Sequence, residues 1–224
     1  MKKNAIFKQN LKKYSMKKLL VLALFSSFSF AYAQFGGVAA PMTALQSGDV
    51  KNLANVKKVN ITYEYKDMGV GAYRNEADYL DKKYKELEEK EKGKGDEFKK
   101  GWEKGKTEQY PDQFIELFNK YGEKDIDMTG TNNGKDAEFN LVVKTTFIEP
   151  GYNIGISKKP AFIDMECIFT DKAGKELARY FLKNAVGSSM TGFDYDVASR
   201  VKESYGKAAK MLVGGIKKDR KKAE

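Results

Sequence analysis

The sequence contains no histidine, which excludes every site that depends on an imidazole. Ser-His-Asp triads, histidine-ligated metals and histidine pH switches are therefore ruled out. The single cysteine, Cys167, allows neither an intramolecular disulfide nor a multi-cysteine metal site. No phosphate-binding glycine loop and no dinucleotide fingerprint is present either. What the chain does contain is 41% hydrophobic and 12% aromatic residues among 224, so we expect one folded domain with a real core.

The first 33 residues have the pattern of a secretory signal peptide. They carry seven basic residues and no acidic one, and an apolar stretch runs from Leu19 to Phe30. An Ala-Tyr-Ala tripeptide follows, so we expect cleavage between Ala33 and Gln34. The apolar stretch is shorter than the roughly 20 residues that a membrane-spanning helix needs. We therefore expect a periplasmic or secreted protein of a Gram-negative bacterium, with no transmembrane span in the mature chain and no lipid anchor.

The net charge of +10 comes mostly from this segment. Without its seven basic residues, 34 of the 41 remain against 31 acidic residues, a net charge of +3. Nucleic-acid binding needs a basic patch on the folded domain, and only the basic C-terminal tail at 217–222 offers one. Because cations also suit the C-terminal end of a helix, we interpret this tail as a solvated helix end and predict no nucleic-acid partner. Contact with an anionic membrane or polysaccharide is the alternative.

Hydrophobic periodicity divides the mature chain into a leader and a domain. Residues 34–55 lack sustained periodicity, which predicts a flexible leader. Residues 56–224 are predicted to form a single α+β domain. Within it, residues 75–122 have helical spacing with many lysines and glutamates on the outer side, which predicts a charged helical insertion.

Alternating apolar residues predict the sheet of this domain. The alternation covers 59–65, 139–148 and 161–170, and 176–185 can return as a hairpin strand. We therefore predict an antiparallel sheet of about four strands, with the insertion between strands 1 and 2. A stripe at three- and four-residue steps predicts a C-terminal helix over 194–216, packed on one face of the sheet. The predicted core comprises Val59, Ile61, Tyr63, Leu141, Val143, Phe147, Ile163, Met165, Phe169, Val201 and Leu212.

One loop has the oxygen spacing of an EF-hand calcium site. Positions 1, 3, 5, 9 and 12 of residues 125–136 bear side-chain oxygens, with glycine at position 6. These oxygens belong to Asp125, Asp127, Thr129, Asn133 and Asp136. Position 12 lacks the usual glutamate, and a strand rather than a helix is predicted to follow. We therefore predict no metal and no other cofactor, and keep weak calcium binding through this loop as an alternative.

A second candidate site lies on the polar face of the predicted strands. Asp164 and Glu166 are two residues apart, as paired carboxylates for hydrolysis could be. Cross-strand ion pairing with neighbouring basic residues is the role we expect for them. Four further residues complete a candidate partner surface: Lys144, Phe162, Arg179 and Lys183. Polar groups interleaved with isolated apolar ones suit either a partner interface or cover by the helices of 75–122.

The order of elements resembles a small α/β domain of exported Gram-negative proteins. The similarity covers roughly residues 139–216 and is clearest in the run from Asp171 to Leu177, at Gly187, and in the long helix from Val197. Domains of this type include the N-terminal domain of the translocation protein TolB and the periplasmic domain of the curli secretion channel. The resemblance implies envelope assembly or partner binding, and not catalysis. The helical insertion and the missing lipid-anchor cysteine depart from the curli type, so no functional residue is carried over.

These observations lead to one expectation about function. We expect an exported cell-envelope protein that acts as a non-enzymatic binding or assembly module, with an envelope protein or polymer as its partner. The alternatives are an envelope hydrolase that uses Asp164 and Glu166, and the calcium-binding protein described above.

Overall fold

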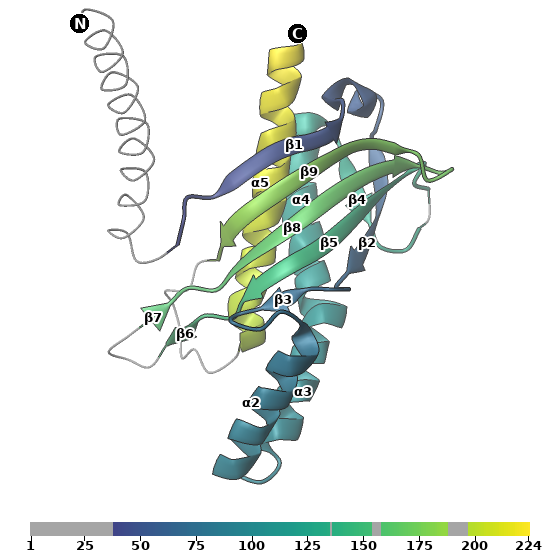
Figure 1. Cartoon of the computed structure of the whole chain (residues 1–224). Helices are drawn as coiled ribbons and strands as arrows, with labels where there is room; N and C mark the ends of the chain where they lie inside the picture. Colours follow the sequence, from purple (N-terminus) through teal and green to yellow (C-terminus); the bar gives the residue numbers. More distant parts are fainter. Residues whose placement is uncertain (1–37, 135, 154–157, 188–196) are drawn as a thin grey trace, which may run out of the picture. The chain divides into compact units, whose positions relative to one another are not determined.

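A computed structural model describes residues 38–134, 136–153, 158–187 and 197–224 (Figure 1). The predicted signal peptide lies outside these residues, as do Asp194 and Asp196, where the C-terminal helix was expected to begin. By its internal contacts, the chain from Ala40 to Glu224 forms one compact unit. Across the described ranges, every helix is too short or too polar to cross a bilayer.

A seven-stranded mixed sheet forms the framework of this unit. In spatial order its strands are β1 (Met42–Gly48), β9 (Glu176–Val186), β8 (Phe162–Asp171), β5 (Phe139–Glu149), β2 (Lys58–Glu64) and β4 (Thr129–Thr131), and β3 (Gly69–Val70) also pairs with β5. The first four are antiparallel to one another, whereas β2 runs parallel to both β5 and β4, and β3 runs parallel to β5. A separate two-stranded sheet joins β6 (Tyr152–Asn153) to β7 (Lys158–Lys159).

The prediction of an antiparallel sheet of about four strands is therefore wrong. Alternation predicts which residues share a face of a strand, but it carries no information about the direction of the neighbouring strand. A parallel pair needs a crossover of a dozen or more residues, usually helical. The chain between β2 and β5 supplies such a crossover, because its helices carry it back to the end of the sheet at which β2 began.

Part of the predicted flexible leader is also ordered. Met42–Gly48 pairs with β9 along its length, from Met42 opposite Lys183 to Gly48 opposite Ala178. A short 3-10 helix, η1 (Val50–Leu53), follows and buries Val50 and Leu53. This strand escapes the sequence pattern because none of its residues is fully buried, and because a bulge after Leu45 interrupts the alternation.

The helices are α2 (Glu76–Lys90), α3 (Lys94–Lys104), α4 (Tyr110–Ile126) and α5 (Val197–Ala223), and the π-helical turn η2 (Gly105–Gln109) joins α3 to α4. Asn75 caps α2 by accepting a hydrogen bond from the backbone N–H of Asp78. In Figure 1, α4 and α5 lie side by side across one face of the sheet, while α2 and α3 form a hairpin that extends beyond the end of β3.

The core lies between the sheet and the pair α4–α5. Alternate residues of β5 and β8 are buried there, and α5 adds Val201, Tyr205 and Leu212. Inside this core the hydroxyl groups of Tyr205 and Thr145 form a hydrogen bond with each other, with 2.6 Å between their oxygens. The predicted core residues are buried, except for Tyr63 and Phe147, which are half-buried.

Candidate binding surface on the sheet

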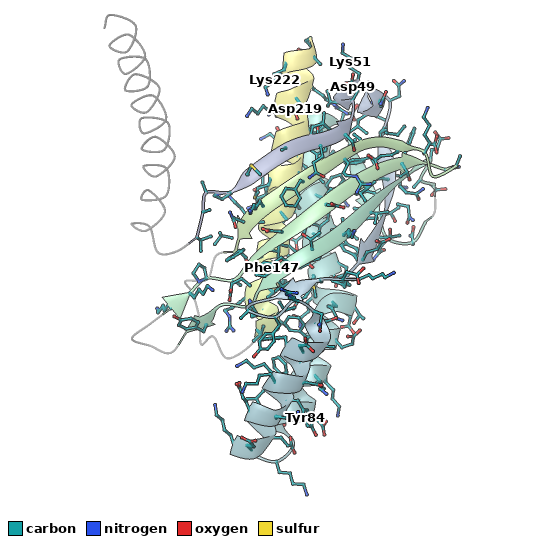
Figure 2. All side chains as sticks on the ribbon, in the orientation of Figure 1. Asp49, Lys51, Tyr84, Phe147, Asp219 and Lys222 are labelled. Atoms are coloured by element: carbon teal, nitrogen blue, oxygen red, sulfur yellow. The ribbon has the colours of Figure 1, made fainter. Side chains whose placement is uncertain are left out.

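A β-bulge in β5 moves Phe147 out of the predicted core. Thr145 lies opposite Met165, but Phe147 lies opposite Asp164, so Thr146 is an extra residue in the ladder. Since side chains alternate along a strand, one extra residue sends Phe147 to the face opposite the helices and returns Ile148 to the core. Figure 2 shows Phe147 near the end of the sheet, where β5 approaches β3.

The sheet face opposite α4 and α5 is called the open face here. Its central side chains come from β5, β8 and β9: Val142, Lys144, Phe147, Phe162, Asp164, Glu166, Ile168, Arg179, Phe181 and Lys183. Apart from exposed Lys183, all of these side chains are half-buried. In Figure 1, α4 and α5 pass behind the sheet and the α2–α3 hairpin lies beyond its end. The interpretation that the helices of 75–122 cover this face is therefore wrong for the described residues.

An ion-pair network crosses the open face. The guanidinium of Arg179 contacts Glu166 at 2.8 Å and Glu176 at 2.6 Å, and Lys144 approaches Glu166 at 3.8 Å. The predicted cross-strand pairing is thus confirmed for Lys144, Glu166 and Arg179. It is wrong for Lys183, which forms no ion pair with any described residue. Because each of the paired side chains keeps between 21% and 36% exposure, the network is reachable from solvent.

Asp164 has a structural partner in the neighbouring strand. Its Oδ1 accepts a hydrogen bond of 2.7 Å from the backbone N–H of Asn184. Burial raises the pKa of this carboxyl above its ordinary 3.8, and the Asn184 N–H and the nearby Lys183 offset part of that rise. Both carboxylates of the candidate hydrolytic pair therefore have structural partners. Asp164 accepts the hydrogen bond from the β9 backbone, and Glu166 forms ion pairs with Lys144 and Arg179.

Aromatic side chains lie between these charged groups. The rings of Phe147 and Phe162 are 5.7 Å apart, and Phe181 is opposite Glu166 in the register of β8 and β9. Aromatic rings next to solvent-accessible ion pairs are found together at protein interfaces, where rings supply contact area and charges supply orientation. The open face therefore has the chemical composition of a surface that binds a macromolecule.

The calcium candidates do not converge. Asp125 belongs to the last turns of α4, and Asp127 ends that helix in the left-handed conformation, so the chain does not wrap around a central point. The three carboxylates are paired with three different lysines: Asp125 with Lys217, Asp127 with Lys57, and Asp136 with Lys58. Thr129 lies in β4, and Asn133 contacts Thr131. In the described part of the chain, no cluster of three acidic or thiol groups could hold a metal ion.

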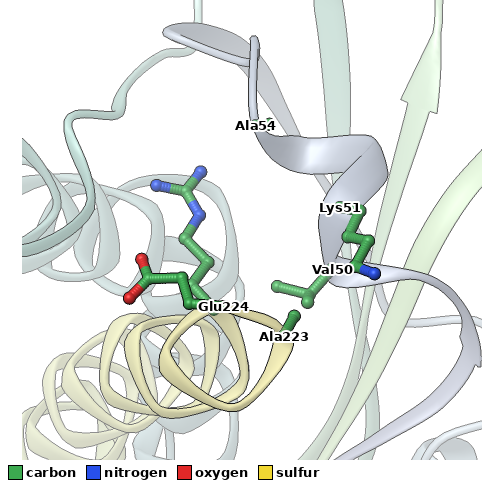
Figure 3. Close-up of a pocket in the computed structure, with 6 residues that line it drawn as sticks. Val50, Lys51, Ala54, Ala223 and Glu224 are labelled. Carbon is green, nitrogen blue, oxygen red and sulfur yellow. The ribbon is translucent and has the colours of Figure 1, made fainter.

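The basic tail at 217–222 is part of α5 and is partly packed. Arg220 donates through Nη1 to the carbonyl of Ile126 and through Nη2 to the carbonyl of Leu53. A pocket of about 270 Å³ lies beside this arginine, with Val50, Ala54 and Ala223 among its walls (Figure 3). The two Nη groups of Arg220 therefore hold the end of α5 against the C-terminus of α4 and against η1.

Comparison with known proteins adds little to this geometry. No family model and no curated protein matches the chain. Among solved structures, it is similar to the PelC dodecamer from Paraburkholderia phytofirmans and to a point variant of that dodecamer, with 10% and 9% identity and a TM-score of 0.34 for each. Each match covers 75% of this chain and 96% of the other. At this TM-score the likeness carries no argument about the present chain.

Proposed function

We propose that this chain is a non-enzymatic binding or assembly module of the bacterial cell envelope, and that it engages a macromolecular partner through the open face. The observation that carries the proposal is the asymmetry of the sheet. One face is buried under α4 and α5, whereas the other presents Phe147, Phe162 and Phe181 between half-buried ion pairs. Aromatic side chains are enriched at protein–protein interfaces, where polar groups lie around them.

Export to the envelope rests on the residues that precede the described unit. The basic segment, the apolar stretch and the small residues before Gln34 together support secretion. N-terminal sequencing of the protein from an envelope fraction should find Gln34 at the mature terminus. Full-length protein retained in the cytoplasm would contradict export.

The enzymatic alternative gains no support from the side chains that it requires. Asp164 and Glu166 are occupied by structural partners, as described above. Burial also raises the pKa of the Cys167 thiol, so this residue is not a nucleophile at neutral pH.

Site-specific crosslinking tests the proposal. A photoreactive amino acid replaces Phe162 on the open face or, as the control, Lys207 on the exposed side of α5. Irradiation in cells should give one adduct of defined mass from position 162 and none from position 207. The partner identified by mass spectrometry, once purified, should bind the wild type and lose affinity for a Phe162→Asp, Lys144→Glu double variant.

Two outcomes would overturn the proposal. Equal adducts from both positions would mean that the crosslinks are unspecific. Turnover of a glycan or peptide library by the purified protein, lost on substitution of Asp164 or Glu166, would establish the hydrolase instead. Circular dichroism of the double variant separates loss of binding from loss of folding.

A further inference from the structure

An apolar pocket lies where the α2–α3 hairpin meets the first turn of α5. Its volume is about 540 Å³, and its apolar walls are Leu87, Phe98, Trp102, Val197 and Ala198. Trp102 is 2% exposed and is held by an aromatic cluster, with Tyr79 at 5.2 Å and Phe98 at 6.2 Å between ring centroids. Small-molecule pockets in proteins typically measure about 300–1,000 Å³ and are mostly apolar, so this pocket is of the appropriate size and character.

The polar side chains at the pocket are already paired with one another or with neighbours. The indole N–H of Trp102 donates to the Glu76 carboxylate, which turns the polar atom of the ring away from any further ligand. Lys94 and Glu97, the charged residues of the lining, form an ion pair at 2.9 Å. An uncharged apolar ligand loses no hydrogen bond to water when it enters such a pocket.

Gly101 keeps one part of the pocket wall free of a side chain. Two other glycines of this helical segment have steric reasons: a Cβ at Gly95 would lie 2.6 Å from the Tyr84 ring, and one at Gly105 would lie 2.7 Å from Tyr110. A Cβ at Gly101 would meet no atom within 4 Å, and the backbone there is not left-handed. The effect of this glycine is to leave the wall of the pocket without a side chain.

We propose that this pocket, here named the hairpin pocket, is a binding site for an uncharged apolar small molecule. Trp102, Phe98 and Leu87 provide the contact surface, and Gly101 provides the room. The site is separate from the open face, so it stands whether or not the open face binds a partner.

The single tryptophan of the chain makes the proposal testable, because all indole fluorescence reports from the wall of the pocket. The probe is N-phenyl-1-naphthylamine, an uncharged aromatic molecule that accepts energy from tryptophan. Titration into the purified protein should give saturable quenching of Trp102. A Gly101→Leu variant, which has space for the new side chain, should lose at least tenfold in affinity for the probe.

Two control variants locate the binding. Gly214→Leu adds the same side chain at an exposed position of α5 where a Cβ also meets nothing, and it should leave the affinity unchanged. Phe162→Asp alters the open face and should likewise leave the affinity for the probe unchanged.

Absence of saturable quenching, or equal affinities for wild type and Gly101→Leu, would overturn the proposal. So would loss of quenching in Phe162→Asp, because the probe would then occupy the open face. If circular dichroism shows that Gly101→Leu is unfolded, the affinity of Gly101→Ala for the probe is measured instead. A reduced affinity supports the site, and an unchanged affinity overturns it.

Discussion

The carboxylate of Asp164 in β8 accepts a hydrogen bond of 2.7 Å from the backbone N–H of Asn184 in β9. Asn184 has a left-handed backbone, with φ of 54°, and lies where the register between the two strands shifts. A bulge leaves one residue outside the regular ladder, so its N–H needs another acceptor. Asp164 supplies that acceptor from the neighbouring strand, which explains why a carboxylate is kept half-buried on the open face.

This relationship predicts different effects for two substitutions of Asp164. Asp164→Ala leaves the Asn184 N–H without its acceptor and should lower the free energy of unfolding by about 1–3 kcal/mol. Asp164→Asn keeps an oxygen in place and should cost much less. Urea denaturation of both variants measures the difference. Equal destabilisation by Ala and Asn would mean that the hydrogen bond does not account for the residue.

The pKa of Asp164 also predicts a dependence of stability on pH. Since its pKa is raised above 3.8 in the folded state, the folded protein binds this proton more tightly than the unfolded chain does. The stabilisation from this group is therefore present below the unfolded pKa and is lost as pH rises through the folded pKa. Relative to wild type, Asp164→Asn should gain stability as pH rises from about 3.8 through the folded pKa, because the variant has no such titration. A constant difference between the two proteins over this window would contradict the prediction.

Leu212 tests the packing of α5 on the sheet. Its side chain is fully buried, so Leu212→Ala should create a cavity and cost about 2–5 kcal/mol of unfolding free energy. Lys207→Ala, on the exposed side of the same helix, should change stability by no more than about 0.5 kcal/mol. An unchanged denaturation midpoint for Leu212→Ala would show that α5 does not pack as described.

Arg220 tests whether the basic end of α5 is a structural element. Arg220→Ala removes hydrogen bonds to the carbonyls of Ile126 and Leu53 and should cost about 1.5–3 kcal/mol. Arg220→Lys should recover little of this, because an ammonium cannot span two carbonyls as a guanidinium does. The exposed neighbour Lys221 provides the control, since Lys221→Ala should be nearly neutral. Thermal melts that rank the Arg220 and Lys221 variants equally would contradict this role.

Much of the antiparallel part of the fold could be predicted from alternation alone. Strands β5, β8 and β9 lie within a few residues of the predicted runs, and the apolar faces of β5 and β8 are the buried ones up to the bulge. The ion pairs of Glu166 with Lys144 and Arg179 followed from the same reasoning, because cross-strand neighbours on one face are determined by the register.

Three features could not be predicted because their causes are non-local. The parallel pairing of β2 with β5 depends on where the crossover helices return the chain, which no local pattern records. The bulge at Thr146 reverses the faces of the residues beyond it, so Phe147 was placed in the core while it lies on the open face. The hairpin pocket depends on Gly101, whose open surroundings become visible only once α2, α3 and α5 are assembled.

The position of β1 has a consequence for the order of folding. β1 begins at Met42, yet its sheet partner is β9, which ends at Val186. Pairing β1 with β9 closes a loop that contains most of the domain, and this closure costs conformational entropy before the strand contacts stabilise it. Folding rates also fall as contacts become more distant in sequence. The β8–β9 hairpin can form locally, and β5 can join it soon afterwards. We therefore expect the strand that is synthesised first to be among the last to be incorporated, so that its backbone groups stay unpaired until the C-terminal third of the chain has emerged.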